Sequence, residues 1–241
     1  GVSLDDAFDL TPELKAAAQA EMQKYRIGPI FTPPSLRGSL IRPSSGGTVS
    51  WGGGSFDPTT NMLYVKTSNG FGNLRLQRYD PKTSRNTLAR ASDQFWIGYE
   101  LTGAPSSFND GLPLNKPPYA ELVAIDMNKG AEAWRVPFGF GEPTLRNHPA
   151  LKGVKLPDRL GTPGTPGSIV TAGGLVFVGG GDRALFAFDK TNGKEIWNAP
   201  IPRRTSGTPM TYRSGSGRQF VLITTGSGTD QELIAFALPG Q

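Results

Sequence analysis

Apolar and polar residues alternate in short blocks along most of this chain. After Arg26, short runs of Val, Ile, Leu, Phe and Tyr are separated by Gly, Pro, Asn and Asp. Such blocks are typical of β-strands joined by tight turns. Residues 10–26 differ, because Thr11 can cap a helix, Pro12 suits its first position and the following ELKAAAQAEMQKY is rich in helix formers. The pattern therefore predicts an all-β protein with one short N-terminal helix.

One pattern of residues occurs twice. AIDMNKGAEAW and AFDKTNGKEIW begin 63 residues apart and share an Asp, a Gly and a Trp at the same spacings. Asp126 and Asp189 can accept hydrogen bonds from backbone amides two or three residues on, and the Gly supplies a positive φ, so each copy predicts a strand, a tight turn and a strand. We expect Trp134 and Trp197 to pack as apolar plates between neighbouring modules.

A second unit recurs three times, beginning at Ser55, Ser168 and Thr208. Each copy is a short strand, a polar or Gly-rich turn, and a strand of aromatic and β-branched residues. Taken in order, the units predict four-stranded antiparallel modules. The clearest module is 168–199, with strands near 168–172, 175–179, 184–189 and 194–199.

The modules on either side are less regular. Residues 69–120 separate the second and third strands of the first module, and their content of Pro, Gly, Asn and Ser predicts a loop-rich insertion with little regular structure. Residues 207–238 supply only three strands. Four-stranded modules that repeat radially are typical of a β-propeller, but this chain holds too few to close a ring. We therefore expect residues 1–241 to be one segment of a larger propeller domain, with open edges that allow self-association.

Composition limits the possible chemistry. The chain has 241 residues with 32 Gly, 21 Pro, no Cys and one His, His148. The lack of Cys excludes disulfides, thiolate zinc sites and iron–sulfur clusters. No GxSxG motif accompanies His148, which we place on a surface loop. The net charge of +5 is dispersed, so nucleic acid is not an expected partner, and no apolar run is long enough to span a membrane.

Three other features are interpreted as structural. GGGD at 179–182 lacks the helix and the Lys-Ser/Thr of a phosphate-binding loop, so it predicts a tight turn. Asp57 precedes Pro58 and is expected to start a turn. Arg203 and Arg204 lie between strands, where we expect a solvated turn.

Together these motifs resemble a known family. The repeated AxDxxxGxxxW pattern resembles the tryptophan-docking repeat of the quinoprotein alcohol dehydrogenase-like propellers, eight-bladed enzymes that use pyrroloquinoline quinone (PQQ). YRIGPIFTPPSLRGSLIRPSSGGTVSWGGGSFDP, GTPGTPGSIVTAGGLVFVGGGDRALFAFDKTNGKEIW and SGTPMTY resemble its membrane-bound glucose, quinate and polyol dehydrogenase branch. The resemblance implies about three blades of the ring, the C-terminal third of such an enzyme, and a periplasmic location.

The resemblance also implies one wall of a PQQ pocket. Ser50 matches a polar PQQ contact that is frequently Asn in relatives, and Trp51 beside it either packs structurally or lines the pocket. Lys66, with Asn69 nearby, matches a position from which the glucose-oxidising branch brings an Asn towards the quinone. A Lys at this place can bond an anionic quinone oxygen or a carboxylate.

A loop continues this implied wall. Thr165, Pro166 and Gly167 match a stretch whose backbone approaches the cofactor, and its Gly-rich character suits close approach to a planar ligand. The family's catalytic Asp, its calcium ligands, the Lys or Arg that bonds the quinone and the Trp under PQQ all lie upstream. No catalytic or metal-binding residue is therefore assigned in this chain.

The implied reaction oxidises a small sugar, polyol or cyclic alcohol. An upstream carboxylate takes the hydroxyl proton while hydride moves to a calcium-polarised quinone. This chain alone is expected to be inactive, with the N-terminal part of the propeller as its partner. The alternative is a non-catalytic propeller with the same repeats that serves as a scaffold for protein binding. An upstream catalytic Asp would distinguish the enzyme from the scaffold.

Overall fold

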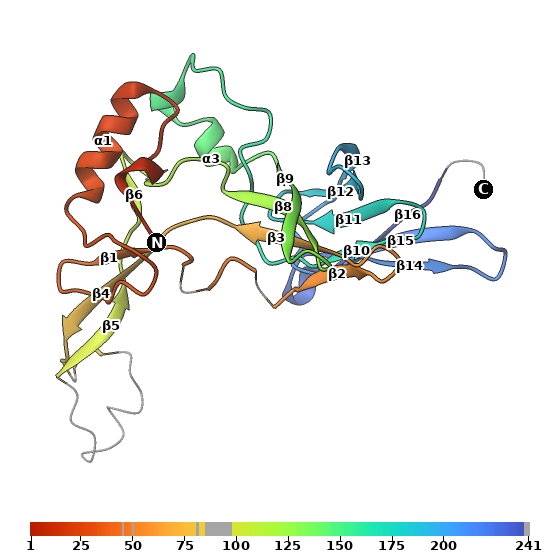
Figure 1. Ribbon diagram of the computed structural model, residues 1–241, viewed down its shortest axis with the longest axis horizontal. Helices are drawn as coiled ribbons and strands as arrows, with labels where there is room; N and C mark the ends of the chain where they lie inside the picture. Colours follow the sequence, from red (N-terminus) through yellow and green to blue (C-terminus); the bar gives the residue numbers. More distant parts are fainter. Residues whose placement is uncertain (45, 50, 81, 85–97, 239–241) are drawn as a thin grey trace. The chain divides into compact units, whose positions relative to one another are not determined.

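Strands dominate this protein in a computed structural model that describes residues 1–44, 46–49, 51–80, 82–84 and 98–238 (Figure 1). The chain divides into two compact units, which are treated separately: residues 1–46 with 70–116, and residues 47–69 with 117–241. All pairs of named strands are antiparallel. The prediction of an all-β fold with a short N-terminal helix is confirmed.

The first unit carries that helix. After a single 3₁₀ turn, η1 (Leu4–Asp6), helix α1 runs over Pro12–Met22. The Thr11 hydroxyl accepts a hydrogen bond from Leu14 N at 3.2 Å, which satisfies one of the free amides at the start of the helix. Ala18 and Met22 are its buried residues. The helix is shorter than the predicted 10–26 but has the predicted cap.

Residues 69–120 contain more regular structure than the sequence predicted. β4 (Gly72–Arg78) pairs with β1 (Ser39–Ile41) and β5 (Tyr99–Gly103), while β6 (Ser107–Phe108) and β7 (Leu112–Pro113) form a hairpin. The prediction of a loop with little regular structure is therefore wrong for these segments. β1 precedes the insertion and is separated from β4 by the segment 47–69, so no local pattern shows the pairing.

The second unit is built from three sheets (Figure 1). The first two have four strands each and the third has three described strands, in the order of the chain. The strands are β2 (Gly54–Asp57), β3 (Met62–Ser68), β8 (Ala120–Asp126) and β9 (Ala131–Pro137); β10 (Ser168–Val170), β11 (Leu175–Gly179), β12 (Ala184–Asp189) and β13 (Glu195–Pro200); and β14 (Met210–Arg213), β15 (Gln219–Thr225) and β16 (Glu232–Phe236). These sheets are the predicted blades of a partial β-propeller.

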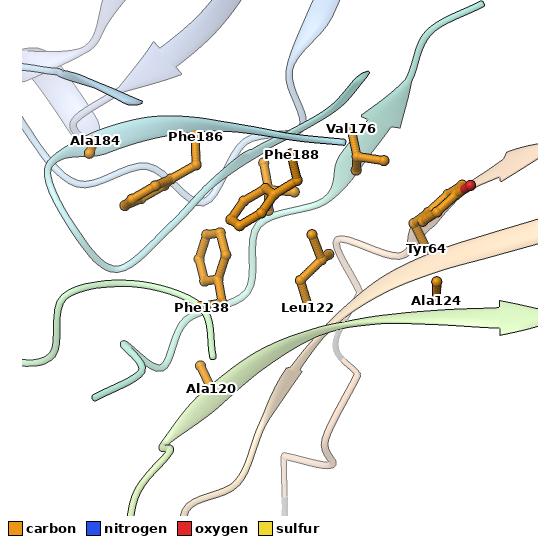
Figure 2. Packing of buried hydrophobic residues seen from close by; sticks show 10 residues of the cluster. Tyr64, Ala120, Leu122, Ala124, Phe138, Val176, Ala184, Phe186 and Phe188 are labelled. Atoms are coloured by element: carbon orange, nitrogen blue, oxygen red, sulfur yellow. The ribbon is translucent and has the colours of Figure 1, made fainter. Parts of the chain in front are cut away.

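Apolar side chains fill the space between the first two blades (Figure 2). Leu122 on β8 and Tyr64 on β3 face the second blade, which contributes Val176, Phe186 and Phe188. Each of these five side chains is at most 2% exposed. Burial of one such side chain contributes on the order of 2 kcal/mol, so this cluster fixes the two blades against each other.

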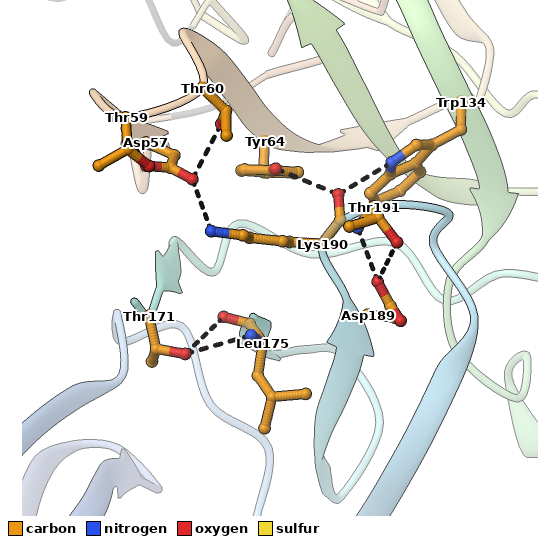
Figure 3. Close-up of polar contacts among 10 residues, drawn as sticks. All are labelled: Asp57, Thr59, Thr60, Tyr64, Trp134, Thr171, Leu175, Asp189, Lys190 and Thr191. Carbon is orange, nitrogen blue, oxygen red and sulfur yellow. Dashed lines mark hydrogen bonds and ion pairs between the residues drawn. The ribbon is translucent and has the colours of Figure 1, made fainter. Parts of the chain in front are cut away.

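Trp134 docks the first blade onto the second (Figure 3). Its indole Nε1 donates to Lys190 O at 3.1 Å, and Tyr64 Oη donates to the same carbonyl at 3.1 Å. Gly193 lies under the ring, because a Cβ at this position would stand 2.6 Å from Trp134 Cε3. The Lys190 ammonium pairs with Asp57 on β2 at 2.8 Å. The predicted packing between modules is confirmed for Trp134.

Trp197 is less covered than its counterpart in the repeat. Its ring meets Phe236 of β16 edge-on at 5.4 Å, so it does contact the third blade, but it stays 39% exposed. In the second blade, the turn that begins at Asp189 covers Trp134. The third blade has Ala237 at the position of that Asp, and its described residues show no such turn. The docking of Trp197 is therefore only partial.

The features interpreted as structural lie in turns and loops. Asp126 Oδ1 accepts from Asn128 N and Asp189 Oδ1 from Thr191 N, which confirms both Asp turns. Of the GGGD sequence, Gly179 ends β11 and the other three residues lie in the connection 180–183 to β12. His148 caps the 3₁₀ turn η2 (Pro149–Leu151), which follows α3 (Pro143–Arg146). Arg203 and Arg204 lie between β13 and β14 with exposed side chains, as predicted, and they form surface ion pairs with Glu232 and Glu142.

Candidate functional site

The first strands of three successive blades begin at one place. Ser55 on β2 and Ser168 on β10 join their hydroxyls at 2.9 Å. Just before these strands, a Cβ on Gly52 would overlap Thr165 O and stand 2.8 Å from Gly167 N. A Cβ on Gly167 would overlap both Gly52 O and the Thr208 hydroxyl that precedes β14. Only glycine permits these backbones to approach so closely.

Trp51 adjoins this meeting point. Its side chain is 76% exposed, and it makes no ring contact or hydrogen bond to the described residues. An indole that packed structurally inside the unit would lose most of that exposure. The exposure favours the pocket role over the structural role that the sequence left open. Ser50, the preceding candidate, lies outside the described residues.

Lys66 is a buried cation on β3. Only 4% of the residue is exposed, and Nζ donates to Gly164 O at 2.5 Å and to Ser68 Oγ at 3.2 Å. Nζ also lies 5.9 Å from the centre of the Phe138 ring. No carboxylate of the described residues forms a salt bridge with it. Burial lowers the pKa of Lys66 to about 7, although the charge of Asp182 opposes that change.

Asn69 uses its amide within the first blade. Its Nδ2 donates to Glu121 Oε2 at 2.6 Å and to Pro118 O at 3.1 Å. The same carboxylate oxygen accepts from Arg135 at 2.6 Å. The structure therefore directs this amide nitrogen towards β8, whereas Lys66 reaches the Gly164 loop.

Asp182 holds the loop that carries Gly164. Its carboxylate accepts from the Thr162 hydroxyl at 2.8 Å and from Phe140 N at 3.1 Å. Burial raises the pKa of Asp182, while the hydrogen bond from Thr162 opposes this change. The Thr162 hydroxyl in turn accepts from Gly141 N at 2.8 Å. These bonds fix the segment from which the loop 164–167 extends towards Lys66 and Gly52.

Comparison with known proteins assigns this arrangement to a family. The sequence model of the PQQ family, described as the glucose/ethanol/alcohol dehydrogenase β-propeller domain, matches residues 1–221. The chain belongs to this family. Quinate/shikimate dehydrogenase (quinone) of Acinetobacter baylyi is 31% identical over 97% of this chain and 30% of its own length. Quinoprotein glucose dehydrogenase A of Acinetobacter calcoaceticus is 32% identical over 87% of this chain and 27% of its own length.

The quinoprotein relatives are much longer than this chain, which spans about a third of their length. Glycerol dehydrogenase large subunit of Gluconobacter oxydans is 31% identical over 97% of this chain and 34% of its own length. Among solved structures, quinohemoprotein alcohol dehydrogenase of Comamonas testosteroni superimposes with a TM-score of 0.53 over 78% of this chain and 24% of its own, at 23% identity. That likeness supports the propeller fold.

In this quinoprotein chain, the structure gathers most of the candidate residues. Gly52, next to Trp51, meets the loop 165–167, and Lys66 binds Gly164 just before that loop, whereas the Asn69 amide nitrogen turns to β8. Sequence reasoning missed Asp182, which it took only for part of a turn, and Thr208, which it saw only as the start of a repeat. Their positions depend on contacts between blades or loops, and the sequence gives no signal of these contacts.

Proposed function

We propose that this chain is the C-terminal portion of a PQQ-dependent dehydrogenase that oxidises a sugar, polyol or cyclic alcohol. In this proposal it supplies one wall of the cofactor pocket. The observation that carries the proposal is that Gly52 meets the loop 165–167 where the first strands begin, while Lys66 binds Gly164 just before that loop. The relatives named for quinate, glucose and glycerol oxidation support the substrate class.

The residues present fit a planar, anionic quinone. A buried ammonium without a carboxylate partner is costly, and an anionic oxygen placed beside it would compensate that charge. Gly52 and Gly167 present bare backbone, and the exposed Trp51 ring offers a flat apolar surface. We therefore assign Trp51, Lys66 and residues 165–167 to the wall, with Ser50 and Asn69 kept from the family resemblance. When bound, PQQ supplies the two-electron oxidation of the alcohol.

In this arrangement Lys66 positions a loop and carries a proton that can be gained or lost. With its pKa near 7, its amine can hold a proton when an anionic group lies beside it and release the proton when none does. Its bond to Gly164 O also ties the loop 164–167 to β3. The residue thus orients the loop and supplies positive charge to the same place.

Other parts of the proposed enzyme lie outside this chain. By analogy with its family, we assign the calcium ligands and the catalytic Asp to the preceding part of the propeller. Among the described residues, no three His, Asp or Glu side chains gather where a metal could bind. β16 is an edge strand of the third blade in the described residues, and we propose that another segment of the ring pairs with it. None of the helices in the described residues has the length and hydrophobicity of a membrane-spanning segment. We place the enzyme in the periplasm, by analogy with its family.

Reconstitution of the full-length protein tests this function. Apoprotein mixed with PQQ and calcium should reduce an artificial dye in the presence of quinate, glucose or glycerol, whereas this 241-residue chain treated in the same way should not. The K66M variant should need more PQQ to reach full activity. Failure of the full-length protein to bind PQQ would contradict the proposal, and alcohol-dependent dye reduction by the isolated chain would contradict its inactivity.

A further inference from the structure

A threonine of the third blade completes the meeting point described above. Thr208 directly precedes Pro209 and the strand β14. A Cβ on Gly167 would overlap Thr208 Oγ1 and stand 3.1 Å from Thr208 Cβ, and it would overlap Gly52 O as well. The bare backbone of Gly167 is therefore flanked by the first blade through Gly52 and by the third blade through Thr208.

The Thr208 hydroxyl makes no hydrogen bond to any described residue, and the residue is exposed. The nearest threonines along the chain differ, because Thr205 Oγ1 accepts from Gly207 N at 3.0 Å and Thr211 Oγ1 donates to Phe220 O at 2.8 Å. A hydroxyl can donate one hydrogen bond and accept two, so Thr208 keeps its full capacity for a ligand.

We infer that Thr208 is a further residue of the cofactor-binding wall, whose hydroxyl forms a hydrogen bond with an oxygen of the bound quinone cofactor. This inference rests on the proposed function. Three successive blades then contribute to one wall: the first through Gly52 and Lys66, the second through the loop 165–167, and the third through Thr208. Because Gly52 and Gly167 carry no side chains, Thr208 supplies a polar side chain where these backbones leave only main-chain groups.

Titration of the full-length apoprotein with PQQ, at saturating calcium and followed by tryptophan fluorescence, tests the inference. Thr208→Val keeps the shape and removes the hydroxyl, so PQQ affinity should fall by about 10-fold, the factor that one ordinary hydrogen bond provides. Thr208→Ala should show the same loss, and Thr208→Ser should stay within about twofold of the wild type. Thr211→Val is the matched control, because it removes a hydroxyl of the same blade and should leave PQQ affinity unchanged.

The outcomes separate this inference from the proposed function. If the wild-type protein does not bind PQQ, the proposed function fails. If the wild type binds PQQ and the Val and Ala variants bind it equally well, only the role of Thr208 is overturned, even where the KM for the alcohol changes. Circular dichroism of each variant confirms folding, and the two hydroxyl-free variants provide independent measurements should one of them misfold.

Discussion

Replacement of Lys66 by Met should stabilise the 241-residue chain at neutral pH. Only 4% of Lys66 is exposed, and its ammonium has only Gly164 O and Ser68 Oγ as hydrogen-bond partners among the described residues. Lowering its pKa from 10.5 to about 7 corresponds to a cost of about 4 to 5 kcal/mol for folding with the charged form. Met has a similar length and no charge to desolvate.

Part of that gain is lost with the hydrogen bonds. Met cannot donate to Gly164 O, but Ser68 Oγ still donates to this carbonyl at 3.3 Å, so the loss should be about 1 kcal/mol. The free energy of unfolding of K66M should therefore exceed that of the wild type by roughly 3 kcal/mol at pH 7. The pH dependence follows from the direction of the pKa change. The cost of burying the Lys66 charge is fully present below about pH 7, where Lys66 is protonated in the folded protein. This cost disappears as the pH rises towards 10.5.

Urea unfolding followed by far-UV circular dichroism between pH 6 and 10 measures this difference. The stabilisation should shrink steadily as the pH rises. In the full-length protein, K66M should bind PQQ more weakly than the wild type. Lys129→Met is the control, since 77% of the Lys129 side chain is exposed and its pair with Asp126 is a surface pair. A K66M chain that is less stable than the wild type at pH 7, or a gain that does not depend on pH, would show that the buried ammonium does not destabilise the fold.

Three other changes test the packing. Trp134→Ala should lower the free energy of unfolding by about 3 to 5 kcal/mol, and Trp197→Ala by less because its ring is 39% exposed; urea titrations that give equal losses would contradict the docking described above. Gly52→Ala should weaken PQQ binding to the full-length protein, because the Cβ overlaps Thr165 O, while Gly70→Ala, which meets nothing within 4 Å, should not. Asp57→Asn should destabilise the chain at neutral pH, because the bond from Lys190 holds the pKa of Asp57 below its usual value. The stabilisation by the Asp57 carboxylate is lost as the pH falls through that lowered pKa, so the stability of the variant should depend less on pH in acid. An acid unfolding transition equal to that of the wild type would argue against this.

The blades could be predicted because their determinants are local. An Asp that bonds the amide two residues on, followed by a Gly at positive φ, specifies the turn wherever it occurs, as at Asp126 and Asp189. The repeat then places Trp134 over the next such turn. Trp197 shows the limit of this logic, because its cover depends on a turn that the third blade does not repeat.

Non-local contacts could not be predicted in the same way. β4 pairs with β1 across an intervening segment of the other unit, and nothing in the Pro- and Gly-rich composition of 69–120 indicates this partner. The candidate wall was found only through a family resemblance, and the sequence could not tell that Lys66 is buried without a carboxylate. It also could not tell that Asn69 is engaged by Glu121 or that the Thr208 hydroxyl is free.

A structure of the full-length protein with PQQ bound would show whether this chain lines the cofactor pocket. We expect PQQ in contact with Lys66, with the backbone of Gly167 and with the Thr208 hydroxyl. A cofactor enclosed entirely by residues outside this chain would contradict this expectation.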